Sequence, residues 1–274
     1  MKKTILWILT IVITLGAAYY QRKTGPTHPK QIIVNLNDTI YKLKLVRSIA
    51  LDERSEIRMN INDPSINARL HFKRLNVEED YQTEEFSNDE KGLFAPVPQQ
   101  PAAGKLEYYI EISDSKGTQV LFKESPIVIR FKGGVPGFIL VPHILFMFVA
   151  MLFSTLAGLM ALTGIPLYKK YAIWTLILFT AGGMILGPVV QYYAFGDLWT
   201  GVPFGWDLTD NKTLISFLFW ILAVFMNRKT DKPIYTIIAA VVLLMIYSIP
   251  HSLFGSQLDY ESGQVTQGMI LNLF

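Results

Sequence analysis

Long apolar runs and short alternating runs divide this chain into two kinds of segment. Five runs are almost entirely apolar: residues 4–20, 138–162, 172–190, 214–226 and 234–254. A helix needs about 20 mostly apolar residues to cross the hydrocarbon of a membrane. The fourth run reaches that length when it is extended from Asn211 to Asn227. The pattern therefore predicts five transmembrane helices.

The first run has a second interpretation. Residues 15–18 (Leu-Gly-Ala-Ala) are acceptable as the cleavage site of a secretory signal peptide. The following Tyr19 to Lys23 is typical of the interfacial end of a retained helix. We favour a retained anchor over residues 1–23 and keep the cleaved peptide as the alternative.

The residues between the first and second apolar runs follow the period of β-strands. Apolar and polar side chains alternate in seven short stretches: 31–36, 39–46, 56–61, 68–72, 106–112, 119–122 and 127–131. This alternation is typical of half-buried strands. About seven such strands in roughly a hundred residues indicate an immunoglobulin-like or fibronectin-like β-sandwich. The acidic stretch from Glu78 to Glu90 is expected to be a solvated loop.

The expected fold is therefore a membrane α-helical bundle joined to an extracytoplasmic all-β sandwich. The anchor covers residues 1–23, and the linker and sandwich cover 24–133. A four-helix bundle follows at 134–255, with an aromatic loop at 191–213. Residues 256–274 are expected to form a solvated tail outside the membrane.

Basic residues predict the orientation, because short cytoplasmic loops carry an excess of Lys and Arg. Lys2 and Lys3 precede the first run, and further basic residues lie at 169–170 and 228–232. Lys212 is the only basic residue of the loop 191–213, and the tail contains neither Lys nor Arg. The N-terminus is thus expected in the cytoplasm, with the β-domain and the C-terminus outside the inner (cytoplasmic) membrane.

Composition narrows the function classes. Hydrophobic residues make up 51% of the 274 residues and charged residues 17%, against about 25% charged in an average soluble protein. A purely soluble enzyme is excluded, and the absence of cysteine excludes thiolate metal sites. The net charge of +3 is too small to indicate nucleic-acid binding. The lipid bilayer, and envelope or membrane proteins reached through the sandwich, are the expected partners.

Two of the four histidines lie in apolar runs, and both follow a proline. Pro142-His143 opens the second run and Pro250-His251 closes the fifth. The predicted topology places both near the outer face at similar depth. Ionisable groups inside a membrane usually face a bundle interior or a cavity, and neutral imidazole is a common ligand of heme iron and other metals. The alternative is that each ring lies at headgroup level, bonded to water or backbone.

The outer loop is rich in aromatic residues and glycine. Six of the eighteen residues from Tyr192 to Thr209 are aromatic, and Gly196, Gly201 and Gly205 allow close approach to a flat partner. An interfacial aromatic belt is the simpler explanation, but it requires neither the glycines nor the adjacent acids. Thr209 is expected to cap the fourth helix, with Asp210 near its positive end.

Part of this loop resembles the tryptophan-rich (WWD-type) heme-handling proteins of cytochrome c biogenesis. Trp206-Asp207 matches the W-D of their signature, and Phe204 stands where they have a tryptophan. Asp210 takes the place of a glutamate three residues later, and 214–217 (Leu-Ile-Ser-Phe) follow in register. Leu208 replaces a proline of the signature.

The resemblance implies the positions of heme ligands. In that family two histidines on flanking spans ligate the heme, and His143 and His251 occupy the matching places. Trp199 lies one residue out of register with the family's first tryptophan, and this chain has fewer spans. The resemblance implies an aromatic platform of Trp199, Phe204 and Trp206, with Asp207 and Asp210 shaping the loop. Lys212 is a candidate partner for a heme propionate or for one of the loop's acids.

Two functions remain open from the sequence. In the first, the chain binds or handles heme at the outer face, in cytochrome assembly or electron transfer. In the second, it is a non-catalytic accessory or assembly subunit, whose β-sandwich docks onto a membrane complex. A transporter fits less well, because the five runs show no repeat. No phosphate loop, H-E-x-x-H or G-x-S-x-G motif occurs, so no catalytic residue is assigned.

The topology is testable with reporter fusions. Fusions at Lys170 and Lys229 should be active only with a reporter that works in the cytoplasm, because both residues lie in basic connecting segments. A fusion at Asp259 is the control and should be active only with an exported reporter. Export of a reporter fused at either lysine would show that the orientation is wrong.

Overall fold

The computed structural model describes residues 2–250 and 255–267. The chain forms two compact units. The helical unit comprises the described residues of 1–26, 135–256 and 266–274, and the β unit comprises residues 27–134 and 257–265. The two units are described separately below.

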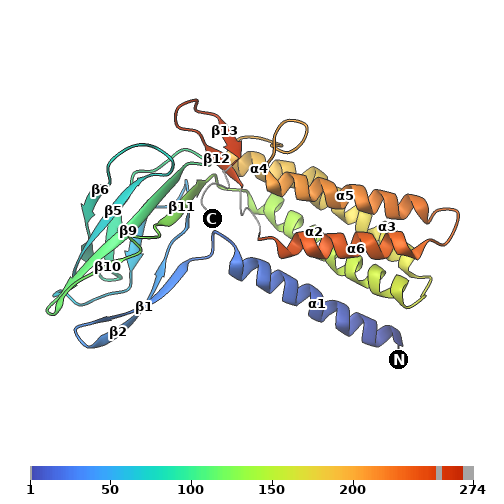
Figure 1. Ribbon diagram of the computed structural model, residues 1–274, viewed down its shortest axis with the longest axis horizontal. Helices are drawn as coiled ribbons and strands as arrows, with labels where there is room; N and C mark the ends of the chain where they lie inside the picture. The colour runs from blue at the N-terminus through green and yellow to red at the C-terminus, as the bar shows by residue number, and fades with distance from the viewer. Residues whose placement is uncertain (1, 251–254, 268–274) are drawn as a thin grey trace. The chain divides into compact units, whose positions relative to one another are not determined.

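The helical unit is a bundle whose helices run side by side (Figure 1). Its elements are α1 (Lys2–Thr24), α2 (Gly137–Leu162), α3 (Tyr168–Phe179), the π-helical segment η1 (Thr180–Leu186), α4 (Gly187–Phe195), α5 (Leu208–Met226) and α6 (Pro233–Ser248). Because α3, η1 and α4 are continuous, they form one apolar helix of 28 residues from Tyr168 to Phe195. The expected third span is therefore longer than its apolar run.

Four helices are long and apolar enough to cross a membrane: α1, α2, the continuous α3–η1–α4 and α5. Among the described residues, four of the five expected spans therefore have a helix that could cross a membrane, which is the character expected of a membrane protein. The fifth, α6, has 16 residues and a length of about 24 Å, which is less than the roughly 30 Å of bilayer hydrocarbon. Residues 251–254, which end the fifth apolar run, lie outside the described residues, so the fifth span stays a prediction.

Small side chains allow the helices of the bundle to approach closely. The main core cluster contains five alanines besides Ala240, together with Phe179 and Trp220. A Cβ added to Gly158 on α2 would lie 2.6 Å from Cβ of Ala240 on α6, so these two helices touch. Such contacts are typical of membrane helices, which gain stability from close packing rather than from exclusion of water. α2 and α6 are therefore direct neighbours.

The first helix packs onto the bundle near its N-terminal end. Leu6 is buried in a cluster with Leu156 and Met160 of α2. The Trp7 ring lies edge-on to Phe153, with ring centres 6.5 Å apart. These contacts make α1 part of the helical unit; the retained anchor stays a prediction.

The β unit contains three sheets around one core. The largest has the order β3-β11-β9-β5-β6, with β10 also paired to β9; β4-β8-β7 and the hairpin β1-β2 form the others. The strands are β1 (Lys30–Leu36), β2 (Thr39–Leu45), β3 (Ser48–Ala50), β4 (Glu56–Met59), β5 (Asn67–Arg74), β6 (Gln82–Glu85), β7 (Ser87–Asp89), β8 (Gly92–Pro96), β9 (Lys105–Asp114), β10 (Gly117–Leu121) and β11 (Ile127–Lys132). Alternate side chains of all three sheets meet in one hydrophobic cluster.

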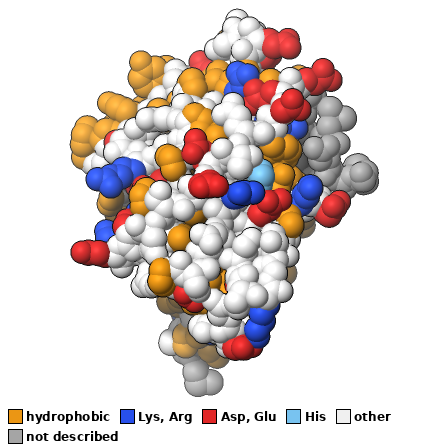
Figure 2. All heavy atoms as spheres, turned by 90° about the vertical axis from the view of Figure 1, so that its left-hand side faces the viewer, with side chains coloured by type: hydrophobic (Ala, Val, Ile, Leu, Met, Phe, Trp, Pro, Cys, Tyr) orange, Lys and Arg blue, Asp and Glu red, His pale blue; other side chains and the backbone are white. Residues whose placement is uncertain are grey.

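All seven predicted strands have a counterpart among these, which confirms the β content. The alternation missed β3, β6, β7 and β8. The expected acidic loop at 78–90 is wrong in part, because it contains β6 and β7. Every residue of these two strands is exposed, so no buried alternate position marked them in the sequence. Acidic and basic side chains intermingle on the face of the molecule shown in Figure 2.

The segment that follows the bundle does not form the expected solvated tail. Residues 257–265 belong to the β unit, and the short strand β12 (Ser256–Leu258) pairs with β13 (Val265–Gln267). The Leu258 N–H donates to the Ala103 carbonyl at 2.9 Å, and Lys105 Nζ donates to Gln257 Oε1 at 3.1 Å.

Tyr260 anchors this segment to the start of β9. Its hydroxyl accepts from the Lys105 N–H at 3.0 Å and donates to the Lys105 carbonyl at 3.1 Å. Burial raises the pKa of Tyr260, so the hydroxyl keeps its proton at neutral pH. The Arg74 guanidinium lies 5.3 Å from the ring centre. Residues 257–260 are therefore fixed by specific contacts within the β unit.

Replacement of Tyr260 by Phe should loosen this anchor. The substitution removes the two hydrogen bonds between the Tyr260 hydroxyl and the Lys105 backbone, at a net cost of roughly 0.5–1.5 kcal/mol for each bond. The Lys105 carbonyl still accepts from the Leu75 N–H at 3.0 Å. Amide exchange at Leu258 and Lys105 should become faster by one to two orders of magnitude. Tyr20→Phe, on an exposed side chain of α1, is the control. Unchanged exchange in Tyr260→Phe would contradict the assigned contacts.

Candidate functional site

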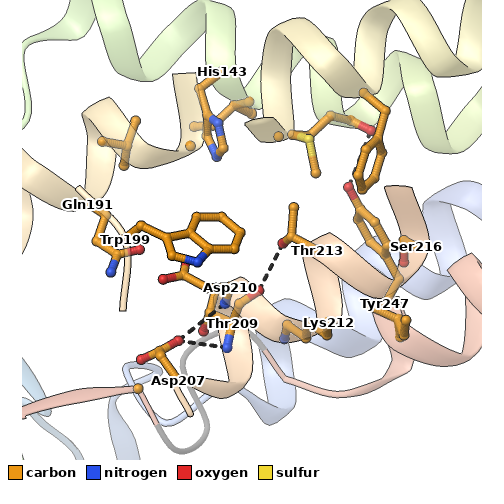
Figure 3. Close-up of a pocket in the computed structure, with 18 of the residues that line it drawn as sticks. His143, Gln191, Trp199, Asp207, Thr209, Asp210, Lys212, Thr213, Ser216 and Tyr247 are labelled. Carbon is orange, nitrogen blue, oxygen red and sulfur yellow. Dashed lines mark hydrogen bonds between the residues drawn. The ribbon is translucent and has the colours of Figure 1, made fainter. Parts of the chain in front are cut away.

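A cavity of about 290 Å³ lies within the helical unit. Its lining side chains come from α1, α2, the η1–α4 segment, the loop before α5, α5 itself and α6. Figure 3 shows His143, Trp199, Thr213 and Tyr247 around the same space. Five of the eight predicted site residues line it: His143, Trp199, Asp207, Asp210 and Lys212.

His143 projects from the second turn of α2 into this cavity (Figure 3). Its Nδ1 lies 2.8 Å from the Gly182 carbonyl oxygen. A carbonyl oxygen can only accept, so Nδ1 carries the proton in this contact. In the neutral ring Nε2 then keeps its lone pair, which makes it available as a metal ligand or proton acceptor. This contact fixes both the orientation and the tautomer of the ring, as a ligating imidazole requires.

The Gly182 carbonyl is placed by the π-helical turn. Gly182 and Gly183 lie in η1 and are buried, and the Gly187 N–H bonds back to Gly182, a five-residue step. A Cβ on Gly182 would lie 2.9 Å from Phe146 Cβ and 3.2 Å from the backbone nitrogen of Met147. Only glycine therefore lets α2 approach closely enough for the His143 contact. π-turns of this kind are often found at functional sites.

Asp210 organises the loop that closes one end of the cavity. Its Oδ2 accepts from the Thr200 N–H at 2.6 Å, the Thr200 hydroxyl at 3.2 Å and the Gly201 N–H at 3.1 Å. Gln191 of α4 donates to the same hydroxyl at 2.7 Å. Asp210 is 5% exposed, so these contacts are protected from water. The carboxylate thus ties the loop to both flanking helices.

Asp207, not Thr209, caps α5. Its Oδ1 accepts from the Thr209 N–H at 2.7 Å and from the Asp210 N–H at 3.3 Å. The expected Thr209 cap is wrong because Asp207 precedes the first helical residue, where a side-chain oxygen reaches the free N–H groups. Ser256 Oγ donates to the other Asp207 oxygen at 3.4 Å. The W-D pair of the sequence resemblance therefore includes a helix cap.

Two of the loop glycines are required by the loop itself. A Cβ on Gly201 would lie 2.7 Å from Asp210 Cβ, and one on Gly205 would lie 2.5 Å from the Thr200 carbonyl oxygen. These contacts are within the loop, so close approach of a flat ligand is not needed to explain either residue.

Lys212 lies on α5 with 7% of its surface exposed. Its ammonium group donates to the carbonyl oxygens of Ile249 and Pro250, at 3.3 and 3.4 Å. These carbonyls follow the C-terminal end of α6, the negative end of a helix dipole. No carboxylate of the described residues lies within ion-pair distance of this ammonium. Among the described residues, these two carbonyls are the hydrogen-bond partners of the ammonium group, which has three N–H donors.

The aromatic platform is smaller than the sequence predicts. Trp199 lines the cavity and its Nε1 donates to the Val202 carbonyl at 3.1 Å. Phe204 and Trp206 are 82% and 74% exposed and do not line it. In an irregular loop, residue type does not reveal the direction in which each side chain points. The sequence analysis therefore grouped three rings that lie apart in the structure.

His251 lies outside the described residues. The described residues on either side of it adjoin the cavity: the Pro250 carbonyl bonds the lining Lys212, and Gly255 lines the cavity itself. α2 and α6, which lead to the two histidines, are neighbours in the core. The expected second ligand stays a prediction.

Sequence reasoning missed six polar lining residues: Gln21, Gln191, Thr213, Ser216, Tyr247 and Ser256. Ser216 is fully buried, and its hydroxyl is without a hydrogen-bond partner among the described residues. Lys212 and Ser216 are four residues apart and share a helix face, which was a usable signal. Tyr247 donates to the Met147 carbonyl at 3.3 Å, and no sequence pattern pointed to that contact.

The chain matches no family model, and comparisons with curated proteins and solved structures gave no match. Within residues 2–250 and 255–267, no group of three or more His, Asp or Glu side chains is arranged to hold a metal ion. The imidazole of His143, the ammonium group of Lys212 and the hydroxyl of Ser216 all line a largely apolar cavity. Such a cavity suits a flat apolar ligand that carries a metal or an anionic group.

Replacement of Asp210 by Ala should loosen the cavity loop. The change leaves three buried donors on Thr200 and Gly201 without their acceptor, at a cost of about 1–3 kcal/mol for each unsatisfied group. Limited proteolysis between residues 196 and 206 should become at least tenfold faster. Asp197→Ala, at an exposed position of the same loop, should leave the rate unchanged. Equal rates in the two variants would contradict the structural role of Asp210.

Proposed function

We propose that this chain is an integral membrane protein that binds heme in the helical-unit cavity, with His143 as an axial ligand. The observation that carries the proposal is the contact between His143 Nδ1 and the Gly182 carbonyl at 2.8 Å. It orients the ring and leaves Nε2 available inside a cavity. The resemblance of residues 204–217 to heme-handling proteins supports the same ligand.

The other lining residues fit the edges of a heme. Trp199 supplies a flat apolar surface, and Lys212 has an N–H donor available for a propionate. Heme would supply an iron centre able to accept and release one electron, or would itself be the cargo. His251 is the proposed second ligand, and the proposal does not depend on it.

The size of the cavity limits how heme is held. Its volume of about 290 Å³ lies just below the range of roughly 300–1,000 Å³ typical of ligand pockets. A porphyrin is larger than this volume. Bound heme would therefore extend through an open side of the cavity or displace the loop 199–206.

We propose a docking role for the β unit. Every residue that lines the cavity belongs to the helical unit, so the β unit is not needed to form the ligand site. Its self-contained core supports an immunoglobulin-like module that binds an envelope or membrane protein. In that case the chain is an accessory or assembly subunit that also carries heme.

The visible spectrum of the detergent-purified chain tests the proposal. Heme added in stoichiometric amount should produce a sharp Soret band with resolved bands after reduction. His143→Ala should lower heme affinity by at least tenfold, because it removes an axial ligand. His28→Ala, in the β unit before strand β1, is the control. A wild-type spectrum that matches free heme in detergent would contradict the function.

A second variant separates ligation from folding. His143→Met introduces an apolar side chain of similar size that can ligate iron through sulfur, so the Soret band should shift rather than disappear. His251→Ala tests the proposed second ligand by the change from six- to five-coordinate bands. Loss of helical circular dichroism in His143→Ala alone would assign its effect to folding.

A further inference from the structure

The walls of the cavity differ in how firmly they are closed. One wall is the loop before α5, which is held by hydrogen bonds. Another is formed by α2 side chains that also reach the outer surface of the bundle. Because these two walls face different surroundings, a ligand that passes the loop and a ligand that passes α2 would enter by different routes.

The loop wall is held by a network of buried hydrogen bonds. Asp210 accepts three bonds from Thr200 and Gly201, and Asn211 accepts one from the Val202 N–H at 2.7 Å. The Asp207 N–H also donates to the Thr200 carbonyl at 3.0 Å. A ligand that passes this wall must break several of these contacts at once. Each buried group left unsatisfied costs about 1–3 kcal/mol.

The α2 wall is apolar and reaches the lipid-facing surface. Ile144 and Phe148 line the cavity, yet they are 44% and 41% exposed. They are four residues apart and lie on one face of the helix. A side chain that borders a cavity and is also exposed marks a place where the cavity is close to the outside. Moving either side chain requires only a change of rotamer.

The position of these residues along α2 places this opening within the membrane. α2 begins at Gly137, so Ile144 and Phe148 lie about 10 Å and 16 Å along the helix axis. The hydrocarbon of a bilayer is about 30 Å thick. α2 is one of the helices long and apolar enough to span it. The surface outside Ile144 and Phe148 is therefore covered by lipid tails.

We propose that the cavity exchanges its ligand laterally with the bilayer, past Ile144 and Phe148. The ligand class is then a membrane-partitioning molecule with a flat apolar body and a polar edge. The inner end of the cavity offers the unpartnered Ser216 hydroxyl to an acceptor on that edge. The inference deepens the proposed heme function but does not require iron ligation, since it concerns the path and not the ligand bond.

Lateral exchange also accounts for the small enclosed volume. An amphiphilic macrocycle larger than 290 Å³ can place one edge near His143 and Ser216 while its apolar remainder extends between helices into lipid. Water-borne exchange would instead expose that apolar surface and require the loop to open. Of the two described walls compared above, the α2 side is therefore the path of lower cost.

Rates of ligand uptake in the full-length protein test this path. The protein is placed in nanodiscs, and ligand is supplied in lipid vesicles, either as heme or as iron-free protoporphyrin IX. Ile144→Trp and Phe148→Trp should slow uptake from vesicles at least tenfold, because the larger ring blocks the opening. Phe148→Ala should accelerate it at least threefold. Absorbance reports heme uptake and fluorescence reports protoporphyrin uptake.

The control is a neighbouring residue that faces lipid but not the cavity. Leu145 is 56% exposed and is not among the lining residues. Leu145→Trp should therefore keep the wild-type uptake rate. Circular dichroism of all variants should be the same, which separates blockage from misfolding. If Leu145→Trp slows uptake as much as Ile144→Trp, the opening is not where we place it.

Three further outcomes distinguish the path from the function. If Asp210→Ala accelerates uptake and Ile144→Trp does not slow it, ligand passes the loop and the lateral path is wrong. If protoporphyrin uptake depends on Ile144 and Phe148 while heme shows no Soret shift, the lateral path stands and the heme function fails. If neither porphyrin is taken up by the wild-type protein, both proposals fail.

Discussion

The hydrogen bond between His143 and the Gly182 carbonyl is the contact on which the chemistry of the cavity depends. It exists because η1 turns its carbonyl toward α2, and because Gly182 has no side chain to hold the helices apart. The bond selects one tautomer and directs Nε2 into the cavity. An imidazole held in this way can ligate a metal or accept a proton without further adjustment, and such an orienting partner is typical of ligating histidines.

The polar residues near the cavity divide into structural and available groups. Asp207 and Asp210 are used by the fold, one as a helix cap and the other as an anchor for the loop. Lys212 is only partly used, since its partners are two carbonyls and no carboxylate of the described residues. Ser216 lacks a partner among them. Buried polar groups in a membrane are costly, so the groups left available indicate a ligand better than the acids do.

The segment after α6 is held by specific contacts within the β unit. Gln257 accepts a hydrogen bond from Lys105 of β9. The bonds of Tyr260 with Lys105 hold the following turn. This part of the chain therefore has a structural role that its polar composition does not indicate.

The sequence by itself determined the division into apolar helices and alternating strands, because each has a period that residue type reveals. It also grouped His143, Trp199, Asp207, Asp210 and Lys212 at one site, because a histidine is rare in an apolar run and the other four share one outer loop. It could not separate Trp199 from Phe204 and Trp206, and it assigned the helix cap to Thr209. Those features depend on loop hydrogen bonds with no period. The strands β6 and β7 could not be read from the sequence because every residue in them is exposed, so no buried alternate position marks them. The Gly182 contact and the docked residues 257–260 were decided only by tertiary structure, because their partners are distant in sequence.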